Sequence, residues 1–343
     1  MSTRTELGQG PAIAERLLDS AAGPIDAVAR AVRDRGIDLV VIAARGTSDH
    51  AAIYAQYILG ARNGLPVALA APSLASLYGS TPRLRNALVL GISQSGRSPD
   101  VVSVLEDARR QGSLTVGITN DPASELALAA DHVVTLEAGE ERGVAATKTY
   151  LASIMLIAML SGALKGDAAS QAELRALPDA LRATLGVEAQ VEAIAAARAG
   201  DDRCVVLARG FQYATAREWA LKIKELAYVL ADPYSAADFQ HGPIALVQAG
   251  FPVLAVATSG PAMPGMLELL GRLRAGKVRL LVLSDDPAAL AMGEGVPLPV
   301  GVPEWLAPLA AIIPAQLFAY HLARARGLDP ETPRNLSKVT LTR

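Results

Sequence analysis

Cysteine is almost absent from this sequence of 343 residues, which contains a single one, Cys204. One cysteine cannot form a disulfide within the chain, and its place in an apolar run indicates a small core residue rather than a nucleophile. Histidine is also scarce: the four histidines are spread along the chain, without a cysteine partner or a metal-ligand spacing. We therefore expect a cytoplasmic protein, in a reducing compartment, that binds no metal and needs no cofactor.

Aromatic residues make up only 4% of the sequence, whereas hydrophobic residues make up 51%. The cores must then be filled by Ala, Leu and Val, a composition typical of parallel α/β layers with buried strands and closely packed helices. The formal net charge is −2. Because the basic residues form no patch interleaved with aromatics, we expect no nucleic-acid partner.

The sequence also lacks a clear targeting or membrane-spanning segment. Residues 1–10 are polar and include Arg4 and Glu6, which does not fit a secretory signal. Two long stretches carry no charge, 149–164 and 305–323. The first is short for a membrane span, and the second contains two prolines, a glutamine and a histidine. Both occupy matching places in an internal repeat, so we predict buried helices and no membrane contact.

The chain contains an internal repeat with an offset of 164 residues. Val-Val-Ile-Ala-Ala-Arg-Gly at 40–46 aligns with Cys-Val-Val-Leu-Ala-Arg-Gly at 204–210, and the apolar stretch near 150 aligns with the one near 314. The repeat predicts two α/β domains of one fold, each a mostly parallel, doubly wound sheet flanked by helices. The predicted segments are a helical arm at 1–22, a first domain at 23–166, a connector at 167–189, a second domain at 190–327 and a tail at 328–343.

The first copy is organised around Leu-Val-Leu-Gly-Ile-Ser-Gln-Ser-Gly-Arg-Ser-Pro-Asp at 88–100. An apolar run at 87–92 predicts a buried strand, and Pro99 suits the first turn of a helix over 99–111. A strand, a loop of small residues and a helix N-terminus form an anion site, because backbone N–H groups and the positive end of the helix dipole point at the ligand. Three hydroxyls in six residues favour a phosphate monoester: Ser93, Ser95 and Ser98.

The alternative for this stretch is a serine-rich turn with an ordinary helix N-cap, and the stretch alone does not decide between them. It matches neither a P-loop nor the dinucleotide fingerprint, so nucleotide binding has no support. The second copy has Ala-Thr-Ser-Gly-Pro at 257–261, with fewer hydroxyls. We therefore expect only the first copy to bind phosphate.

Other residues could carry chemistry, although each has a structural alternative. Lys222 and Glu225 are three residues apart in a predicted helix and share a face, but a surface ion pair is the default explanation of that spacing. His241 precedes Gly-Pro in a predicted loop, which raises the odds of a function, while most lone histidines are structural. Lys338 lies in the tail; most tail lysines are solvated, but a desolvated lysine can form a Schiff base with a carbonyl.

Six motifs follow one another along the chain: Arg-Gly-Thr-Ser at 45, Ser-Gln-Ser-Gly at 93, Gly-Val-Ala-Ala-Thr-Lys at 143, Ala-Leu-Lys-Ile-Lys-Glu at 220, His-Gly-Pro at 241 and Pro-Arg-Asn-Leu-Ser-Lys at 333. In these motifs the chain resembles the sugar isomerase (SIS) domain proteins. The resemblance extends over residues 24–343 and is strongest to the isomerase half of glucosamine-6-phosphate synthases and to the stand-alone type II glucosamine-6-phosphate deaminases. It implies two tandem SIS domains of the α/β class.

The resemblance implies roles for particular residues. Glu225 would shuttle a proton between C1 and C2 of the sugar, with Lys222 beside the developing enolate charge. Lys338 would engage the C2 carbonyl, as an imine or as a proton donor, when the tail closes on the site. His241 would assist ring opening; in related enzymes it comes from the partner subunit, which implies a homodimer with shared active sites. The residues that bind the phosphorylated sugar would be Ser48, Ser93, Gln94, Ser95, Ser98, Val144 and Ser337.

The resemblance also implies a reaction. A chain that starts Met-Ser-Thr lacks the N-terminal cysteine nucleophile of the glutamine-hydrolysing half. We therefore expect deamination, in which glucosamine 6-phosphate and water give fructose 6-phosphate and ammonia. Ser98 stands where the synthases usually have Thr, Ala146 replaces a common Ser, and Asp238 replaces a Glu, so the exact sugar stays open.

Three alternatives to this reaction stay open. A fructosamine-6-phosphate deglycase and another aldose–ketose phosphosugar isomerase would use the same groups. A non-catalytic sugar-phosphate sensor is of another class. Such sensors often carry a DNA-binding helix-turn-helix, for which the N-terminal arm has no room, and they need not keep all three predicted catalytic groups. Catalysis is therefore the favoured interpretation.

Overall fold

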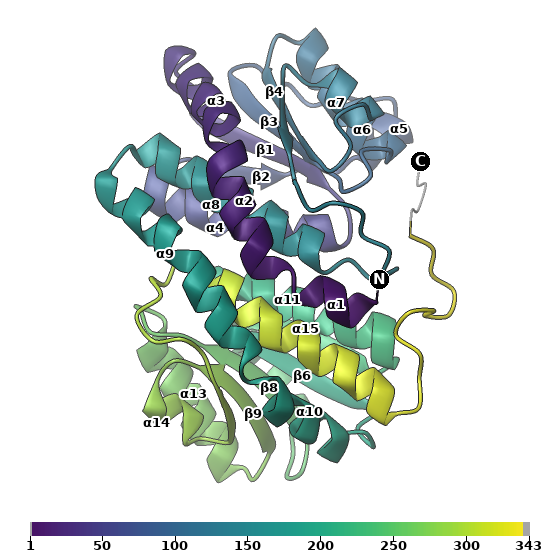
Figure 1. Cartoon of the computed structure of the whole chain (residues 1–343), viewed down its shortest axis with the longest axis vertical. Helices are drawn as coiled ribbons and strands as arrows, with labels where there is room; N and C mark the ends of the chain where they lie inside the picture. Colours follow the sequence, from purple (N-terminus) through teal and green to yellow (C-terminus); the bar gives the residue numbers. More distant parts are fainter. Residues whose placement is uncertain (1, 339–343) are drawn as a thin grey trace. The chain divides into compact units, whose positions relative to one another are not determined.

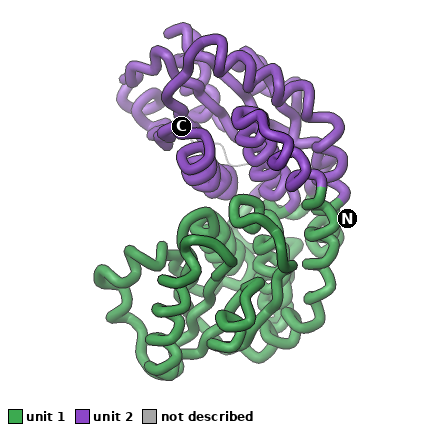
Figure 2. The backbone as a smooth tube through the Cα atoms, turned by 90° about the vertical axis from the view of Figure 1, so that its left-hand side faces the viewer, with its two compact units in different colours: residues 1–11, 142–147, 176–336 green, residues 12–141, 148–175, 337–343 purple. Residues whose placement is uncertain are grey.

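The computed structural model describes residues 2–338, in which the chain divides into two compact units (Figure 2). The first-repeat unit, purple in Figure 2, contains residues 12–141, 148–175 and, among the described residues of the tail, 337–338. The second-repeat unit, green, contains residues 2–11, 142–147 and 176–336. The contiguous domain boundaries inferred from the sequence stay a prediction.

The first-repeat unit contains a sheet of parallel strands in the order β2-β1-β3-β4-β5. From β1 the chain moves outward to β2 and then crosses to β3 on the other side, so the strand order reverses between β1 and β3. Ligands of open α/β sheets bind beyond the carboxyl ends of the strands at such a point. The strands are β1 (Leu39–Ala44), β2 (Val67–Leu69), β3 (Ala87–Ile92), β4 (Leu114–Thr119) and β5 (His132–Thr135).

The second-repeat unit has a sheet of the same topology. Its parallel strands lie in the order β10-β9-β8-β6-β7, which is the first order read from the opposite edge. Val205 pairs with Val253 just as Val41 pairs with Val89, and both partners are shifted by the same 164 residues. The two-domain α/β fold is thereby confirmed. The strands are β6 (Arg203–Ala208), β7 (Leu230–Ser235), β8 (Pro252–Ala257), β9 (Arg279–Ser284) and β10 (Glu294–Pro297).

Helices cover both faces of the first sheet: α6 and α7 lie on one side, and α3, α4 and α8 on the other (Figure 1). Side chains of β1 and β3 form a core with Val101 and Leu105 of α6. The strand approaches these helices closely, since a Cβ atom on Gly91 would lie 2.7 Å from side-chain carbons of Leu105 and Leu126. The helices are α3 (Ala22–Asp34), α4 (Thr47–Asn63), α5 (Ser73–Ser76), α6 (Pro99–Arg110), α7 (Glu125–Ala129) and α8 (Lys148–Lys165).

Helix α8 is long and apolar enough to cross a membrane by length and composition, with a mean hydropathy of 1.2 over its 18 residues. Within the protein, however, 83% of that stretch is buried, and α8 packs against α3 and α4. A core helix of this kind passes the same test as a membrane span, so one such helix is weak evidence for a membrane. The burial agrees with the core helix that the repeat predicts.

The second-repeat unit is built around the buried helix α15 (Ala307–Ala325), which packs against α10 and α11. The ring of Trp219 meets that of Phe318 edge to face, with centroids 5.5 Å apart. The remaining helices in chain order are α1 (Thr3–Leu7), α2 (Gly10–Ser20), α9 (Ala168–Leu185), α10 (Glu188–Ala197), a 3-10 turn (Gly210–Gln212), α11 (Tyr213–Lys222), a π-helix (Ile223–Ala227), α12 (Ala236–Gln240), a 3-10 turn (Pro243–Leu246), α13 (Met263–Ala275) and α14 (Pro287–Leu290).

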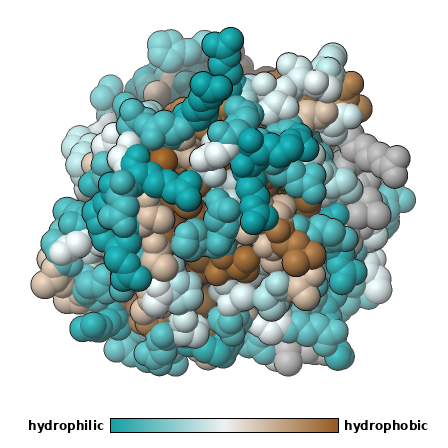
Figure 3. Space-filling model, turned by 90° about the horizontal axis from the view of Figure 1, so that it is seen from above, coloured by the Kyte–Doolittle hydropathy of each residue, from teal (hydrophilic) through white to brown (hydrophobic). Residues whose placement is uncertain are grey.

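The surface drawn in Figure 3 is mainly hydrophilic, with hydrophobic residues showing between the polar ones in separate patches. Several large apolar side chains of the described residues are exposed, including Tyr78, Leu128 and Leu230. Single exposed apolar residues are normal on globular proteins and need no partner to explain them.

Candidate functional site

The loop Ser93–Ser98 follows β3 directly, at the reversal point of the first sheet. Gly96 adopts φ +65°, and a Cβ atom there would lie 2.0 Å from Ser124 Oγ and 2.8 Å from Thr119 Oγ1. Only glycine fits, because the close approach leaves no room for a side chain and the left-handed backbone disfavours one. The tight turn brings the loop hydroxyls to the carboxyl end of the sheet, as the sequence predicted.

The serine hydroxyls organise the loop itself. Ser93 Oγ accepts the backbone N–H of Gly96 at 3.2 Å and lies 3.5 Å from Ser98 Oγ. Ser95 Oγ accepts the N–H of Arg97 at 3.3 Å. Ser98 is the N-cap residue of α6, yet its hydroxyl makes no capping hydrogen bond. The positive end of the α6 dipole is therefore not satisfied by that side chain, which suits an anionic ligand.

A pocket of about 250 Å³ opens beside this loop. Two predicted substrate-binding residues, Gln94 and Ser95, share its wall with the predicted catalytic lysine, Lys338. All three belong to the first-repeat unit. The complete lining is Gln94, Ser95, Arg97, Asn120, Asp121, Glu140, Glu141 and Lys338.

Lys338 is held in the pocket by a buried carboxylate. Its Nζ lies 2.6 Å from Glu141 Oε2, and the Glu141 side chain is fully buried while that of Lys338 is 26% exposed. Glu141 also accepts the N–H of Thr149 at 3.1 Å and its hydroxyl at 2.8 Å. Thr149 lies in the first turn of α8, so the helix N-terminus fixes the carboxylate and the carboxylate fixes the lysine.

The pocket contains charges of both signs. Arg97 lies 3.6 Å from Asp121, and Lys338 is paired with Glu141, so two of the carboxylates face cations. Nearby, the Nε of Arg45 donates to Asp100 Oδ2 at 2.6 Å, and Asp100 is buried in the first turn of α6. These pairings reduce the negative charge that would otherwise repel a phosphate.

The second-repeat unit contains a buried charge cluster at Lys222 and Glu225, where a surface ion pair was the default explanation of the spacing. Lys222 is fully buried, contacts the carboxylate of Glu225 and lies 3.4 Å from Glu218 Oε1. Burial disfavours the charged amine, but the two adjacent carboxylates outweigh it and raise the pKa of Lys222 above its usual value. The lysine is thus a cation throughout the neutral range, and Glu225, 21% exposed, is the cluster member that reaches the surface.

The segment that carries Glu225 is wound as a π-helix, from Ile223 to Ala227, directly after α11. Short π-helical turns occur mostly at functional sites, since they give up regular helical hydrogen bonds to redirect side chains. The next residue, Tyr228, ends the turn in the left-handed conformation, with φ 56° and ψ 33°.

The remaining predicted site residues lie at several places. Ser48 is half-buried in the first turn of α4, after β1, and Ser337 is exposed in the tail. His241 is exposed at the end of α12, and its N–H donates to the carbonyl of Asp238 at 3.0 Å. Val144 is half-buried in the segment 142–147 of the second-repeat unit. Their roles stay predictions.

Among residues 2–338, no three His, Cys, Asp or Glu side chains lie together in a way that could hold a metal ion. Cys204 is buried, and burial raises the pKa of its thiol to about 12, so it is a poor nucleophile or ligand. That the site works without metal or cofactor stays a prediction from the sequence.

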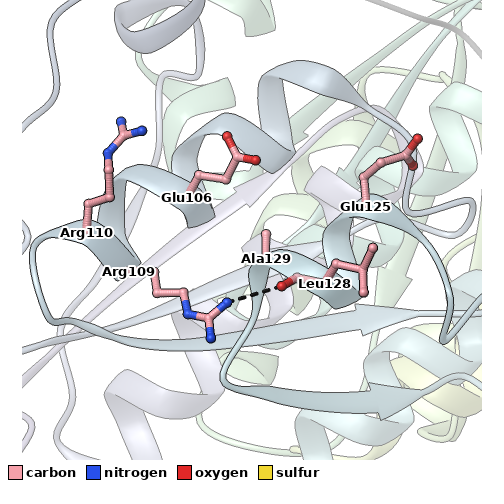
Figure 4. A pocket seen from close by; sticks show the side chains of 6 residues that line it. All are labelled: Glu106, Arg109, Arg110, Glu125, Leu128 and Ala129. Atoms are coloured by element: carbon pink, nitrogen blue, oxygen red, sulfur yellow. Dashed lines mark hydrogen bonds between the residues drawn. The ribbon is translucent and has the colours of Figure 1, made fainter.

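A larger hollow of about 590 Å³ lies on the outer side of α6 and α7 (Figure 4). It is lined by two arginines, two glutamates and short apolar side chains, and Arg109 donates to the carbonyl of Leu128 at 3.2 Å. No predicted site residue lines it. Size alone therefore does not identify the site, and the smaller pocket at the strand ends is the better candidate.

The sequence did not single out Glu141, Asp121 or Glu218. Asp121 lies two residues after the end of β4, the neighbour of β3, and that position was the available signal. Glu141 belongs to a pair of glutamates that resembles a solvated charge run, and only the fold buries it. Glu218 precedes Lys222 by four residues, a spacing that is also common on helix surfaces.

Comparison with known proteins identifies the family. The model of the SIS domain matches residues 36–162 and 199–326, which correspond to the two repeats. A curated relative from Pyrococcus horikoshii, named glutamine–fructose-6-phosphate aminotransferase [isomerizing], is 36% identical over 307 residues, covering 88% of this chain and 51% of the relative. The chain thus spans about half the length of the curated relatives it matches.

Two solved structures show the same fold. A candidate phosphosugar isomerase from Silicibacter pomeroyi DSS-3 has a TM-score of 0.86 and 35% identity, covering 95% of this chain and 98% of that one. The C-terminal domain of glucosamine-fructose-6-phosphate aminotransferase from Francisella tularensis has a TM-score of 0.85 and 24% identity, covering 96% and 97% of the two chains. The second likeness supports the fold alone.

Proposed function

Since the chain belongs to the SIS domain family, we propose that it is a phosphosugar isomerase that deaminates glucosamine 6-phosphate. The reaction would consume water and release fructose 6-phosphate and ammonia. The curated relatives are named glutamine–fructose-6-phosphate aminotransferase [isomerizing], which supports a phosphorylated sugar as the substrate. The observation that carries the proposal is the pocket in which Lys338 meets Gln94 and Ser95.

The phosphate would bind at the serine loop. Its hydroxyls lie at the carboxyl end of β3 and the N-terminus of α6, where backbone dipoles favour negative charge. The sugar would then extend from the loop with C1 and C2 at its far end, within reach of Lys338. A phosphate held at one end uses binding energy to orient the reacting carbons at the other.

Glu225 and Lys222 would carry out the proton transfer. The Glu225 carboxylate removes the proton from C2 of the open-chain aldehyde, and the electron pair moves towards O1, where the Lys222 cation offsets the developing charge. The substrate's ammonium group passes a proton to O1, and Glu225 returns its proton to C1, which leaves a protonated imine at C2. Water adds to this imine and ammonia leaves, giving the ketone of fructose 6-phosphate.

Lys338 would act at C2, either as a proton donor or by exchanging with the substrate nitrogen as an imine. His241 would assist ring opening from the partner subunit of a homodimer. The cytoplasm is the expected location. These assignments rest on the family resemblance, and the buried environment of Lys222 supports catalysis over sensing, because a buried cation between two carboxylates is costly to maintain without a use.

The test measures ammonia release from a panel of amino-sugar phosphates with wild-type protein, Glu225→Gln and Glu268→Gln. Glu268 is an exposed glutamate of α13 in the same unit and serves as a matched control. We expect turnover of glucosamine 6-phosphate, a fall in kcat of about 10²- to 10⁴-fold in Glu225→Gln, and no change in Glu268→Gln.

Other outcomes would assign the alternatives. Release of an amino acid from fructosamine 6-phosphates, with no reaction of glucosamine 6-phosphate, would replace deamination by deglycation. Binding of these compounds without turnover would make the protein a sensor. Full activity of Glu225→Gln would remove Glu225 from the mechanism.

A further inference from the structure

Tyr228 is strained and lies next to the proposed base. It follows the π-helix that carries Glu225 and adopts φ 56° and ψ 33°. Residues with a bulky side chain rarely occupy this left-handed region, and those that do are held there by their surroundings. The contacts of the Tyr228 side chain show which residue holds Tyr228 in this conformation.

Tyr228 binds the tail through two contacts with one residue, Arg334. The Tyr228 hydroxyl accepts the backbone N–H of Arg334 at 2.7 Å. The guanidinium of Arg334 stacks over the ring, with its central carbon 4.0 Å from the ring centroid. All these atoms belong to the second-repeat unit. One side chain therefore fixes both the backbone and the side chain of a tail residue.

The preceding hydrogen bonds from the tail to another segment are made three residues earlier, by Glu331, and Pro333 between them is buried. The Glu331 carboxylate accepts the N–H of Thr3 at 3.0 and 2.9 Å and the Thr3 hydroxyl at 2.9 Å. Four residues beyond Arg334, Lys338 pairs with Glu141. Lys338 thus lies four residues from the Tyr228 anchor and seven from the Glu331 anchor.

We propose that Tyr228 is a positioning residue that clamps Arg334 and so keeps Lys338 at the serine-loop pocket. This inference rests on the proposed function for its catalytic consequence, but the clamp itself can be tested without it. The segment with the proposed base and the segment with the proposed lysine would then be held by one tyrosine.

The length of chain sets the size of the effect. Four extended residues span at most about 14 Å and seven about 25 Å, so losing the Tyr228 anchor enlarges the volume open to Lys338 about fivefold. For a flexible chain, the effective concentration of Lys338 at the pocket falls as the −3/2 power of the tether length. Lengthening the tether from four to seven residues then lowers this concentration about twofold. We expect the clamp to contribute about two- to fivefold to kcat/KM through Lys338.

The first experiment follows tryptic cleavage after Arg334 in the folded protein, with intact mass identifying the product that ends there. Tyr228→Phe removes the hydrogen-bond acceptor and keeps the ring, and Tyr228→Asn removes both while tolerating the left-handed backbone. We expect cleavage about fivefold faster in Tyr228→Phe and more than about tenfold faster in Tyr228→Asn. Tyr234→Phe, which loses a hydroxyl contact to Asp232 elsewhere in the unit, is the matched control and should leave the rate unchanged.

Two results would overturn the clamp: an unchanged cleavage rate in Tyr228→Asn, or equal acceleration in Tyr234→Phe. If Tyr228→Asn fails to fold, Arg334→Lys gives the same information, because it keeps a tryptic site and loses the planar stack. In that variant cleavage after residue 334 should also become faster, and an unchanged rate would count against the clamp.

The second experiment measures kcat/KM for glucosamine 6-phosphate in Tyr228→Asn, Lys338→Gln and the double variant. A residue that acts through Lys338 has nothing left to position once Lys338 is gone, so the loss of about two- to fivefold from Tyr228→Asn should disappear in the Lys338→Gln background. An equal loss in both backgrounds would show a general structural role and overturn the inference. If the wild type shows no turnover, the proposed function fails, whereas the cleavage experiment still decides the clamp.

Discussion

The loops after β3 and β8 occupy the same place in the two repeats, yet they differ in what surrounds them. In the first repeat, Gly96 is approached by the hydroxyls of Ser124 and Thr119. In the second, Gly260 is approached by the carboxylate of Glu304, whose carbon would lie 2.4 Å from a Cβ atom there. The loop glycine is therefore approached by neutral hydroxyls in one unit and by an acid in the other.

A second carboxylate strengthens the contrast. Asp285 follows β9 as Asp121 follows β4, at the repeat offset, and its Oδ1 accepts the loop N–H of Ser259 at 2.8 Å. Asp121 instead lies 3.6 Å from Arg97. The counterpart of Arg97 in the second loop is Pro261, which has no charge to attract an aspartate.

We infer that the arginine-to-proline difference at this position contributes to the different roles of the two loops. In the second repeat a protein carboxylate already occupies a loop N–H group, so this loop stabilises the fold. In the first repeat the aspartate faces an arginine, so the loop stays available to an anion from solution. The proposed phosphate site at the serine loop depends on this difference.

The largest effect should come from replacing the loop glycine of the first repeat by alanine, with the matching replacement in the second repeat as its control. Gly96→Ala forces a Cβ atom against Ser124, which cannot withdraw without moving its backbone. We expect binding of fructose 6-phosphate to weaken by at least about tenfold in Kd, and the free energy of unfolding to fall by about 1–3 kcal/mol. Gly260→Ala also strains its backbone, but Glu304 can rotate away and no ligand is affected. Calorimetric titration with thermal unfolding measures both, and equal weakening of binding in the two variants would contradict the contrast.

A medium effect is expected from Arg97→Gln. Without the arginine, Asp121 can turn towards the loop as Asp285 does, and we expect about a fivefold weaker Kd for fructose 6-phosphate. Because the arginine is largely exposed, stability should change by less than about 0.5 kcal/mol. Adding Asp121→Asn should restore part of the affinity; if the double variant binds no better than Arg97→Gln, the aspartate is not the competitor.

The smallest effect concerns the acid of the second loop. Burial raises the pKa of Glu304 above its usual value, so the folded protein favours the protonated form more than the unfolded chain does. The stability that this carboxyl contributes is therefore greatest at low pH and falls as the pH rises through its folded pKa. We expect Glu304→Gln to gain in Tm relative to wild type between pH 4 and pH 7. A constant difference across that range would mean that Glu304 is solvated.

Apolar runs in the sequence indicate most strands of both sheets, whereas two edge strands of the second sheet give no such signal. The limits of β1, β3 and β4 follow from apolar runs that end in glycine or hydroxyl residues, and the repeat transferred the pattern to the second sheet. Strand β7 has no recognisable strand pattern because it contains Asp232-Pro233, a pair that a central strand does not tolerate but an edge strand does. The short edge strand β10 has two glycine or proline positions among four residues and gives no strand pattern.

The candidate site was predictable where local motifs carry it. The serine loop follows from its strand, its small residues and Pro99, and the structure places Gln94, Ser95 and Lys338 in one pocket. The carboxylates that pair with Lys338 and Lys222 were not predictable. Glu141 and Glu218 differ from surface glutamates only because the fold buries them. A spacing of three residues also cannot distinguish an α-helix from the π-turn that presents Glu225.

The buried Cys204 makes the molecule convenient for spectroscopy. It is the sole thiol of the sequence, and its pKa of about 12 keeps it unreactive towards maleimide reagents at neutral pH. Cysteines introduced at the exposed positions of Tyr78 and Leu230 would therefore accept fluorescent probes with little background labelling. One probe would lie in each unit, so energy transfer between them would report any opening or closing when a sugar phosphate binds.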